Sequence, residues 1–295
     1  MKTVAILGPT ASGKSDLAIR VAKEVGGVIL SLDSLSIYKE IDIASAKPSL
    51  KERKGVKHFG IDLINVNEPF NVAIFANLFE EAKGYAKKAN SPLIIVGGTG
   101  FYLKILLEGI SELPTPDDRI VQEVARVLKD LPSAYRTISA LDSEYAKRIS
   151  PSDRYRIEKG LLIYHLTSKT PTDYFKENPP VPLLKSVELY EIGIEKEILN
   201  ERIEKRTEKM FEAGLVDEVA NLEYRYGRLH NPMKAIGIKE VLDYFDGKLT
   251  LDRTKERIVI ATRQLAKRQR TFNKTQLPPH PLLSADEIFE KIVES

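Results

Sequence analysis

The chain has 295 residues, of which 42% are hydrophobic, and this is enough to bury one full core and a smaller second one. Lys and Arg together exceed Asp and Glu by only 45 to 42, so the net charge alone does not indicate a polyanionic partner. The absence of cysteine excludes disulfides and thiolate metal sites.

Membrane and export signals are weak. Apolar runs such as LIIV and IVIA are far shorter than the roughly 20 residues that a membrane helix needs. The N-terminus runs directly into a predicted strand, which leaves no space for a signal peptide. We therefore expect a cytoplasmic protein without a membrane segment, and we expect it to act as a monomer.

The first hundred residues alternate between short β-branched runs and helical patterns, which is typical of βαβ units and a parallel sheet. The runs that predict strands are VAILG, VILSLDS, HFGIDLI and PLIIVGG. Helices are predicted over residues 14–26 and 71–90, and Asn71 is placed to cap the second of these.

The pattern changes from about Pro114 to Pro182, where the sequence is mostly helical and has no strong strand. This stretch closes with ENPPVPLL, whose prolines do not fit inside a helix or a central strand. We predict that residues 116–182 form an inserted helical domain between two parts of the core, 1–115 and 183–295. The core resumes with a strand in SVELYEIGI and with helices in EILNERIEKRTEKMFEAG, MKAIGIKEVLDYFDG and TLDRTKERIVIATRQLAKRQRTF.

A phosphate-binding loop is predicted in GPTASGKS, between the first strand and the first helix, because it has the P-loop spacing. Backbone N–H groups and Lys14 attract phosphate oxygens in such a loop, and Ser15 offers a hydroxyl to Mg²⁺. The predicted phosphate site consists of Gly8, Pro9, Thr10, Ala11, Ser12, Gly13, Lys14 and Ser15. The predicted fold class is accordingly α/β, a P-loop NTPase-like parallel sheet flanked by helices, with an inserted mainly helical domain. The loop alone does not distinguish an ATPase, a kinase and an enzyme whose substrate carries a diphosphate.

Asp33 follows the second predicted strand, at the carboxyl edge of the sheet and beside the P-loop if the two strands are neighbours. Three interpretations compete: a magnesium carboxylate, a base for a bound acceptor, or a turn cap together with Ser34. The fourth strand ends in GGTG without the carboxylate that many P-loop ATPases carry there, which weakens the ATPase interpretation. Thr99 offers a hydroxyl in this turn, although a tight strand-to-helix turn explains the glycines equally well.

Positive charge is concentrated near the C-terminus. Between residues 253 and 274 eight cations stand against the single Glu256, a local charge of +7. At helical spacing Arg263, Lys267 and Arg270 share one face, and such a one-sided stripe favours a polyanion over a merely solvated helix. Phe272 at its end is more typical of a core residue than of a stacking platform.

Two smaller basic clusters point the same way. Arg154, Arg156 and Lys159 lie in the predicted insertion, and Arg202 and Arg206 are one helical turn apart, a spacing suited to holding a diphosphate together. Each cluster by itself would be an ordinary salt-bridged helix.

Taken together, these segments resemble the tRNA dimethylallyltransferase family, also called the tRNA isopentenyltransferases or IPP transferases, over nearly the whole chain. The matching stretches are GPTASGKS, SLDSLSIYKEIDIASAKPS, HFGIDL, VGGTGFYLKILLEG, AIGIKE and ATRQLAKRQRTF. The chain departs from the family pattern at Ile238, Phe272 and Lys159, where the family often has Tyr, Trp and Arg.

The resemblance implies transfer of a dimethylallyl group from dimethylallyl diphosphate to the N6 amine of adenosine 37, in the anticodon stem-loop of tRNA, with release of diphosphate. The resemblance implies that the P-loop binds the diphosphate of the donor and not ATP. Arg206, alone or together with Arg202, helps to bind this diphosphate. The resemblance also implies that Asp33 is the base at the adenine amine, that Thr99 lies near the flipped base, and that Mg²⁺ with Ser15 as a ligand is the cofactor.

Four segments match the tRNA-facing segments of the family, and the inserted domain is implied to bind tRNA. The residues implied to contact tRNA, besides Thr99, are Asp33, Ser34, Leu35, Ser36, Tyr155, Arg156, Ile157, Glu158, Lys159, Ile236, Gly237, Ile238, Lys239, Glu240, Lys267, Arg268, Gln269, Arg270, Phe272 and Lys274.

Three alternatives stay open on the sequence. A small-molecule or nucleoside kinase also pairs a P-loop with an Asp after the second strand, but it binds ATP and needs no basic helix. An isopentenyltransferase acting on free adenine nucleotide shares the loop without the tRNA-facing segments. A nucleic-acid-binding module with a vestigial P-loop would bind RNA and transfer nothing.

Overall fold

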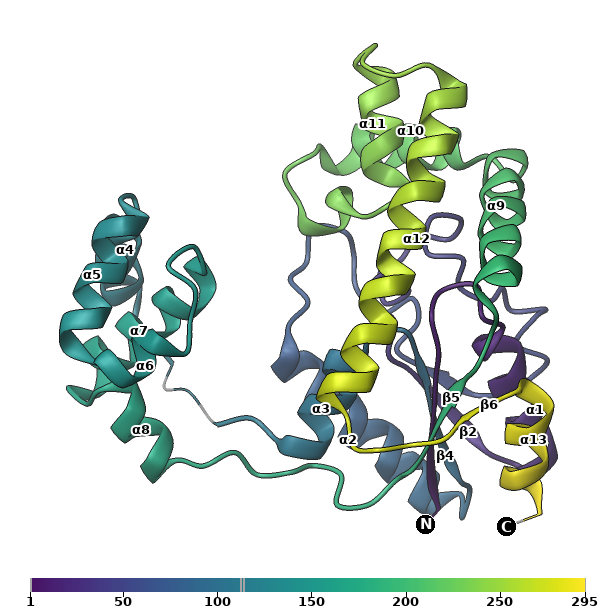
Figure 1. The fold of residues 1–295 in the computed structure, drawn as a ribbon, viewed down its shortest axis with the longest axis horizontal. Coiled ribbons are helices and arrows are strands. Elements are labelled where there is room, and N and C mark those ends of the chain that lie inside the picture. The colour runs from purple at the N-terminus through teal and green to yellow at the C-terminus, as the bar shows by residue number, and fades with distance from the viewer. Residues whose placement is uncertain (1, 112, 114, 295) are drawn as a thin grey trace. The chain divides into compact units, whose positions relative to one another are not determined.

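The computed structural model describes residues 2–111, 113 and 115–294 of the chain. The chain divides into two compact units, one formed by residues 1–107 with 184–295 and the other by residues 108–183 (Figure 1). The predicted insertion, 116–182, lies inside the second unit. None of the helices in the described part of the chain is long and apolar enough to cross a membrane.

The first unit is built on a parallel sheet with the strand order β3-β2-β4-β1-β5-β6. Its strands are β1 (Thr3–Leu7), β2 (Val28–Ser31), β3 (His58–Phe59), β4 (Leu93–Gly97), β5 (Glu188–Ile192) and β6 (Leu282–Leu283). β4 pairs with β1 from Thr3 opposite Leu93 to Leu7 opposite Gly97, and both strands are buried along their length. The predicted α/β class and the five predicted strands are confirmed. The two-residue β6 was not predicted, because so short a strand has no pattern of its own.

The first unit also contains helices, some of which flank the sheet while others pack on one another. They are α1 (Lys14–Val25), α2 (Val72–Lys88), α3 (Gly100–Glu108), α9 (Lys196–Glu212), α10 (Leu215–Tyr226), the short 3₁₀ helix η1 (Asn231–Lys234), α11 (Ile238–Phe245), α12 (Leu251–Gln276) and α13 (Ala285–Val293). The single helix predicted over MKAIGIKEVLDYFDG is wrong: the chain leaves η1 after Lys234 and α11 starts only at Ile238. Gly237 between them has φ +94°, which an α-helix does not accommodate. The sequence analysis also did not identify α10 and α13.

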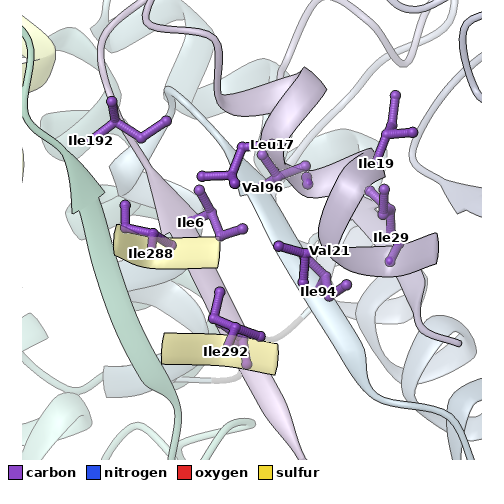
Figure 2. Close-up of a cluster of buried hydrophobic side chains, with 13 residues drawn as sticks. Ile6, Leu17, Ile19, Val21, Ile29, Ile94, Val96, Ile192, Ile288 and Ile292 are labelled. Carbon is purple, nitrogen blue, oxygen red and sulfur yellow. The ribbon is translucent and has the colours of Figure 1, made fainter. Parts of the chain in front are cut away.

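One core cluster of the first unit lies between the sheet and the helices α1 and α13 (Figure 2). Leu17 and Val21, one turn apart on α1, pack there, and Ile288 and Ile292 do the same on α13. α1 ends where Gly26 adopts φ +63°, and α13 starts at a capping box on Ser284. This packing fixes β1 and α1, and therefore the loop between them.

The second unit is helical, which confirms the mainly helical insertion. It contains α4 (Asp118–Val127), α5 (Leu131–Leu141), α6 (Ser143–Lys147), α7 (Arg154–Thr167) and α8 (Pro171–Glu177). Each of these helices begins with a side chain that caps a backbone N–H, from Asp117, Asp130, Asp142, Asp153 and Thr170. Its own core includes Val124, Ile138, Ile157 and Leu161.

Candidate active site

The P-loop connects the end of β1 to the start of α1. Ala11 and Gly13 both have left-handed backbone angles, φ +64° and +91°, which give the compact turn of an anion-binding nest. Gly8 is tightly enclosed, since a Cβ there would lie 2.6 Å from the Ser12 hydroxyl. The Lys14 ammonium folds back over the loop and donates a hydrogen bond of 3.2 Å to the Pro9 carbonyl.

A cavity of about 360 Å³ opens at this carboxyl end of the sheet. Of the residues predicted for the site, it brings together Thr10, Lys14, Ser15, Asp33, Ser34, Leu35, Ser36, Thr99, Arg206, Ile236 and Gln269. The other predicted residues of the first unit do not line it: Gly8, Pro9, Ala11, Ser12, Gly13, Arg202, Gly237, Ile238, Lys239, Glu240, Lys267, Arg268, Arg270, Phe272 and Lys274.

From the sequence, Asp33 is expected beside the P-loop only if β2 and β1 are neighbours. The two strands are not neighbours, but Asp33 still lines the cavity. β4 lies between the two strands; it ends at Gly97, and Gly98 follows it. A Cβ at Gly97 would lie 2.6 Å from Cβ of Leu32, and one at Gly98 would lie 2.2 Å from Nε2 of Gln269. The glycines of GGTG therefore let the end of β2 and the helix α12 close directly onto the end of β4, with Asp33 at the cavity.

The carboxylate of Asp33 has two distinct oxygens. Oδ1 accepts hydrogen bonds from the backbone N–H of Leu35 at 2.9 Å and of Ser36 at 3.4 Å, so the residue does cap its turn. No hydrogen bond to Oδ2 is present within the described residues. The turn-cap and base interpretations of Asp33 are thus compatible in one side chain.

Lys14 and Arg206 line the cavity together with Asp33. Burial lowers the pKa of Lys14 to about 8, the charge of Asp33 opposes this decrease, and the charge of Arg206 adds to it. Burial also lowers the pKa of Arg206, against the influence of Asp33. Because one carboxylate compensates two cations, the cavity favours an incoming anion.

Arg202 and Arg206 are both close to the P-loop but play different parts. Arg206 lines the cavity, and its Nη2 donates a 3.4 Å hydrogen bond to the carbonyl of Ser45. Arg202 does not line it; its side chain is exposed and its Nη1 donates to the carbonyl of Ser12 at 3.1 Å. Of these two arginines, Arg206 is the one that lines the cavity, and Arg202 braces the loop.

The basic helix α12 carries less free charge than the sequence predicts. Arg263 forms an ion pair with Glu204 of α9, and Lys255 forms one with Glu208 at 2.7 Å. Arg270 is half-buried and donates to the carbonyl of Ile194 at 2.6 Å. Two members of the predicted stripe of Arg263, Lys267 and Arg270 are therefore engaged within the protein, by α9 and by the segment after β5, and binding of a polyanion by the stripe stays a prediction.

Three cations remain on α12 near its C-terminal end. Lys267, Arg268 and Lys274 are exposed, and within the described residues they form no ion pair. Phe272 is half-buried and packs against Gly100, where a Cβ would lie 2.9 Å from its ring, so its interpretation as a core residue holds only in part.

Burial removes some predicted side chains from any contact surface. Ile157 and Ile238 are both fully buried. In the second unit Tyr155 remains 65% exposed, with the Lys159 ammonium 5.6 Å from its ring centre, whereas Arg156 forms an ion pair with Asp153. The exposed part of this cluster is an aromatic ring flanked by cations.

The sequence analysis missed one wall of the cavity. It is formed by Ala44, Ser45, Ala46, Lys47 and Pro48. Lys47 is only 4% exposed in its side chain and forms ion pairs with Asp42 at 2.7 Å and Asp62 at 2.5 Å. The sequence signal for this wall is the stretch IDIASAKPS, in which a lysine stands between small residues and a proline. This stretch contributes to the family resemblance, but by itself it predicts no cavity wall.

The donor set at the cavity suits a magnesium ion only in part. Within the described residues no group of three or more His, Cys, Asp or Glu side chains is able to hold a metal ion. Mg²⁺ commonly keeps several waters and uses one or two protein oxygens together with substrate phosphates. Ser15, which is exposed and lines the cavity beside Asp33, fits an ion that arrives with a diphosphate.

Comparison with known proteins agrees with this geometry. The model of the family described as IPP transferase matches residues 36–276. A tRNA dimethylallyltransferase from Nautilia profundicola is 52% identical over 290 residues, 98% of each chain, and one from Sulfurimonas denitrificans is 51% identical over 276 residues, 94% of this chain and 93% of its own.

Solved structures agree as well. A crystal structure of tRNA delta(2)-isopentenylpyrophosphate transferase from Staphylococcus epidermidis is 29% identical, with a TM-score of 0.71 over 100% of this chain and 98% of that one. A eukaryotic dimethylallyltransferase acting on tRNA is 27% identical, with a TM-score of 0.84 over 97% of this chain and 74% of that one. With a matching family model over most of its length and relatives about half identical to it, the chain belongs to the IPP transferase family.

Proposed function

We propose that this protein transfers a dimethylallyl group from dimethylallyl diphosphate to the N6 amine of adenosine 37 in tRNA and releases diphosphate. The observation that carries the proposal is that Asp33 lines the same cavity as Lys14, Ser15 and Arg206. One cavity thus combines a group that accepts a proton with groups that bind a diphosphate. The names of the relatives support the same reaction.

The cationic side of the cavity binds the donor. Negative charge grows on the diphosphate as its bond to the prenyl carbon breaks, and fixed positive groups stabilise that charge without rearranging. Lys14 and Arg206 supply two such groups, and the P-loop amides supply partial charges. Mg²⁺, held by Ser15 and the diphosphate, would neutralise further charge on the leaving group.

Asp33 serves the acceptor. The lone pair of an exocyclic adenine amine is delocalised into the ring, so the amine attacks well only if its proton is removed. As the new N–C bond forms and the C–O bond breaks, Oδ2 of Asp33 takes this proton. The two amides on Oδ1 hold the carboxylate in place during the transfer. Thr99 orients the flipped base, and its place in the lining of the same cavity supports this role.

The exposed cations contact the tRNA backbone. Extracting a base from its stack costs a few kcal/mol, and contacts to phosphates offset this cost. Lys267, Arg268 and Lys274 on α12 provide such contacts, and Tyr155 with Lys159 provides another in the second unit.

One experiment separates this function from its alternatives. The protein is incubated with Mg²⁺ and labelled dimethylallyl diphosphate in the presence of unmodified tRNA, AMP or ATP. Label in tRNA, lost when the tRNA carries G at position 37, supports the proposal. Label in AMP alone identifies a transferase for free nucleotides, and hydrolysis or transfer from ATP alone identifies a kinase.

We further propose that the protein acts as a monomer in the cytoplasm. The predicted monomer has a mass of 33.2 kDa. Light scattering after gel filtration, with and without tRNA, measures the mass of the protein in solution. A protein mass twice as large would contradict the monomer.

A further inference from the structure

The cavity wall that contains Ala44 and Ser45 is an irregular segment that does not belong to the sheet. It follows Glu40, which has φ +64°, and Ala46 within it has φ +47°, both uncommon for residues other than glycine. Such a backbone persists only where contacts around it define it. The question is therefore which contacts hold this wall.

Glu218 of α10 holds it from outside the cavity. Its Oε2 accepts hydrogen bonds from the backbone N–H of Asp42 at 2.9 Å and of Ile43 at 2.7 Å, and its Oε1 accepts one from Ala44 at 2.9 Å. Three consecutive amides converge on one carboxylate, although some 175 residues of chain separate them from it. Consecutive N–H groups of this kind form an anion nest, which a side chain of the same protein fills here.

The same segment touches the diphosphate-binding side of the cavity one residue later. The carbonyl of Ser45 accepts the hydrogen bond from Nη2 of Arg206. Ser45 is itself buried, and its hydroxyl donates to the carbonyl of Ile41 at 2.5 Å, which closes the segment into a rigid turn. A continuous set of contacts thus leads from Glu218 through residues 42–45 to Arg206.

We propose that Glu218 is a positioning residue: it fixes residues 42–44 so that the Ser45 carbonyl holds Arg206 in the orientation that binds the diphosphate of the donor. This inference rests on the proposed function, because it takes the diphosphate as the ligand of Arg206. It assigns to α10, an element outside the cavity, a part in the affinity for the donor.

The charge on Glu218 is costly, which supports a positioning role over a purely stabilising one. Burial raises the pKa of this half-buried carboxyl, with a smaller contribution from Asp42, and the three amides only partly oppose the increase. When folding raises the pKa of a carboxyl group, ionisation of that group at higher pH lowers the free energy of unfolding of the protein. A glutamate carboxylate only accepts hydrogen bonds, whereas the glutamine amide of similar size also donates them. The carboxylate is therefore suited to bind three backbone N–H groups.

The test compares Glu218→Gln and Glu218→Ala with Ser284→Ala. Gln keeps the shape of the side chain, but its NH₂ group cannot accept a hydrogen bond from the backbone N–H groups of residues 42–44. Ala removes all three hydrogen bonds to these groups. Ser284 caps α13, far from the cavity lining, and its replacement by Ala removes a typical cap. It is therefore a control for stability loss alone.

Three quantities are measured: hydrogen exchange of the amides of residues 42–44, the affinity for inorganic diphosphate, and the KM and kcat for dimethylallyl diphosphate. We expect Glu218→Ala to accelerate the exchange and to weaken diphosphate binding and raise the donor KM about tenfold, with kcat changed by less than about threefold. Glu218→Gln gives a smaller change in the same direction. Ser284→Ala changes none of the three.

Unchanged exchange in Glu218→Gln and Glu218→Ala, or faster exchange with unchanged diphosphate affinity and KM, would overturn the inference. Failure of the proposed function has a different signature. In that case the wild-type protein transfers no prenyl group to tRNA, while exchange and diphosphate binding still report on Glu218.

Discussion

Gln269 joins the helix α12 to the P-loop: its Oε1 accepts a hydrogen bond of 2.8 Å from the backbone N–H of Thr10. One turn further along the chain, the buried Asn273 donates to Glu191 of β5 at 2.8 Å. The helix that carries the exposed cations is therefore attached to the P-loop. The family resemblance implies that Gln269 contacts tRNA, whereas in the structure its side chain turns toward the P-loop.

Replacing Gln269 by Ala should leave the Thr10 N–H without its partner. Losing a partner of a partly buried amide costs about 1–3 kcal/mol, so we expect a lower melting temperature and a higher donor KM. Gln269→Glu is the informative companion, because it keeps an acceptor for Thr10 but adds a negative charge at the cavity. It should retain more stability than Gln269→Ala and bind the donor more weakly. A Glu variant with wild-type donor affinity would show that Gln269 does not face the diphosphate.

Replacing Asp33 by Asn separates the two functions of this side chain. Asn keeps an oxygen that accepts from Leu35 and Ser36, so the turn persists, but its amide does not take a proton. We expect a decrease in kcat of roughly 10²-fold or more with nearly unchanged tRNA affinity, measured by single-turnover transfer and by filter binding. Ser284→Ala, which removes the cap of α13, is the control and should retain activity. Turnover near the wild-type value in Asp33→Asn would refute the base assignment.

The lowered pKa of Lys14 predicts a pH dependence of donor capture. Lys14 attracts the diphosphate only when protonated, and its pKa in the free protein is about 8. The kcat/KM for the donor should therefore decrease as the pH rises through about 8, because this ratio reports on free enzyme. A bound diphosphate favours the charged ammonium, so kcat should stay level to higher pH. In Lys14→Arg the side chain stays charged, so kcat/KM for the donor should no longer decrease in this pH range. If kcat/KM still decreases in this variant, the titrating group is not Lys14.

The exposed cations of α12 should contribute to tRNA binding through phosphates. Each contact to a phosphate adds about 1 to the slope of log affinity against log salt concentration, so Lys267→Ala with Arg268→Ala should reduce this slope by about 2. Arg263→Ala is the matched control, because Arg263 is already paired with Glu204. It should leave the slope unchanged. Equal slopes for all three proteins would exclude this surface from the tRNA contact.

Local patterns were enough to predict most of the fold. The P-loop spacing, the short β-branched strands and the prolines of ENPPVPLL are features of neighbouring residues, and each acts through backbone conformation or periodicity within a few positions. The same is true of Asn71, which caps α2 as predicted, with its side chain accepting from Ile74. Short or context-dependent elements such as β6 and η1 were missed, because tertiary contacts and not their own sequence define them.

By itself the sequence determined the phosphate loop, the class of the sheet and the candidate proton acceptor after β2, since motif spacing and strand order along the chain specify these. Only the tertiary structure decided that β4 lies between β1 and β2, that Arg206 and not Arg202 lines the cavity, and that Arg263 and Arg270 are bound within the protein. The physical reason is that hydrogen bonds and ion pairs between α9, α10, α12 and the loops join residues far apart in the chain. The choice of partner then depends on which helices pack together, and no local pattern encodes it.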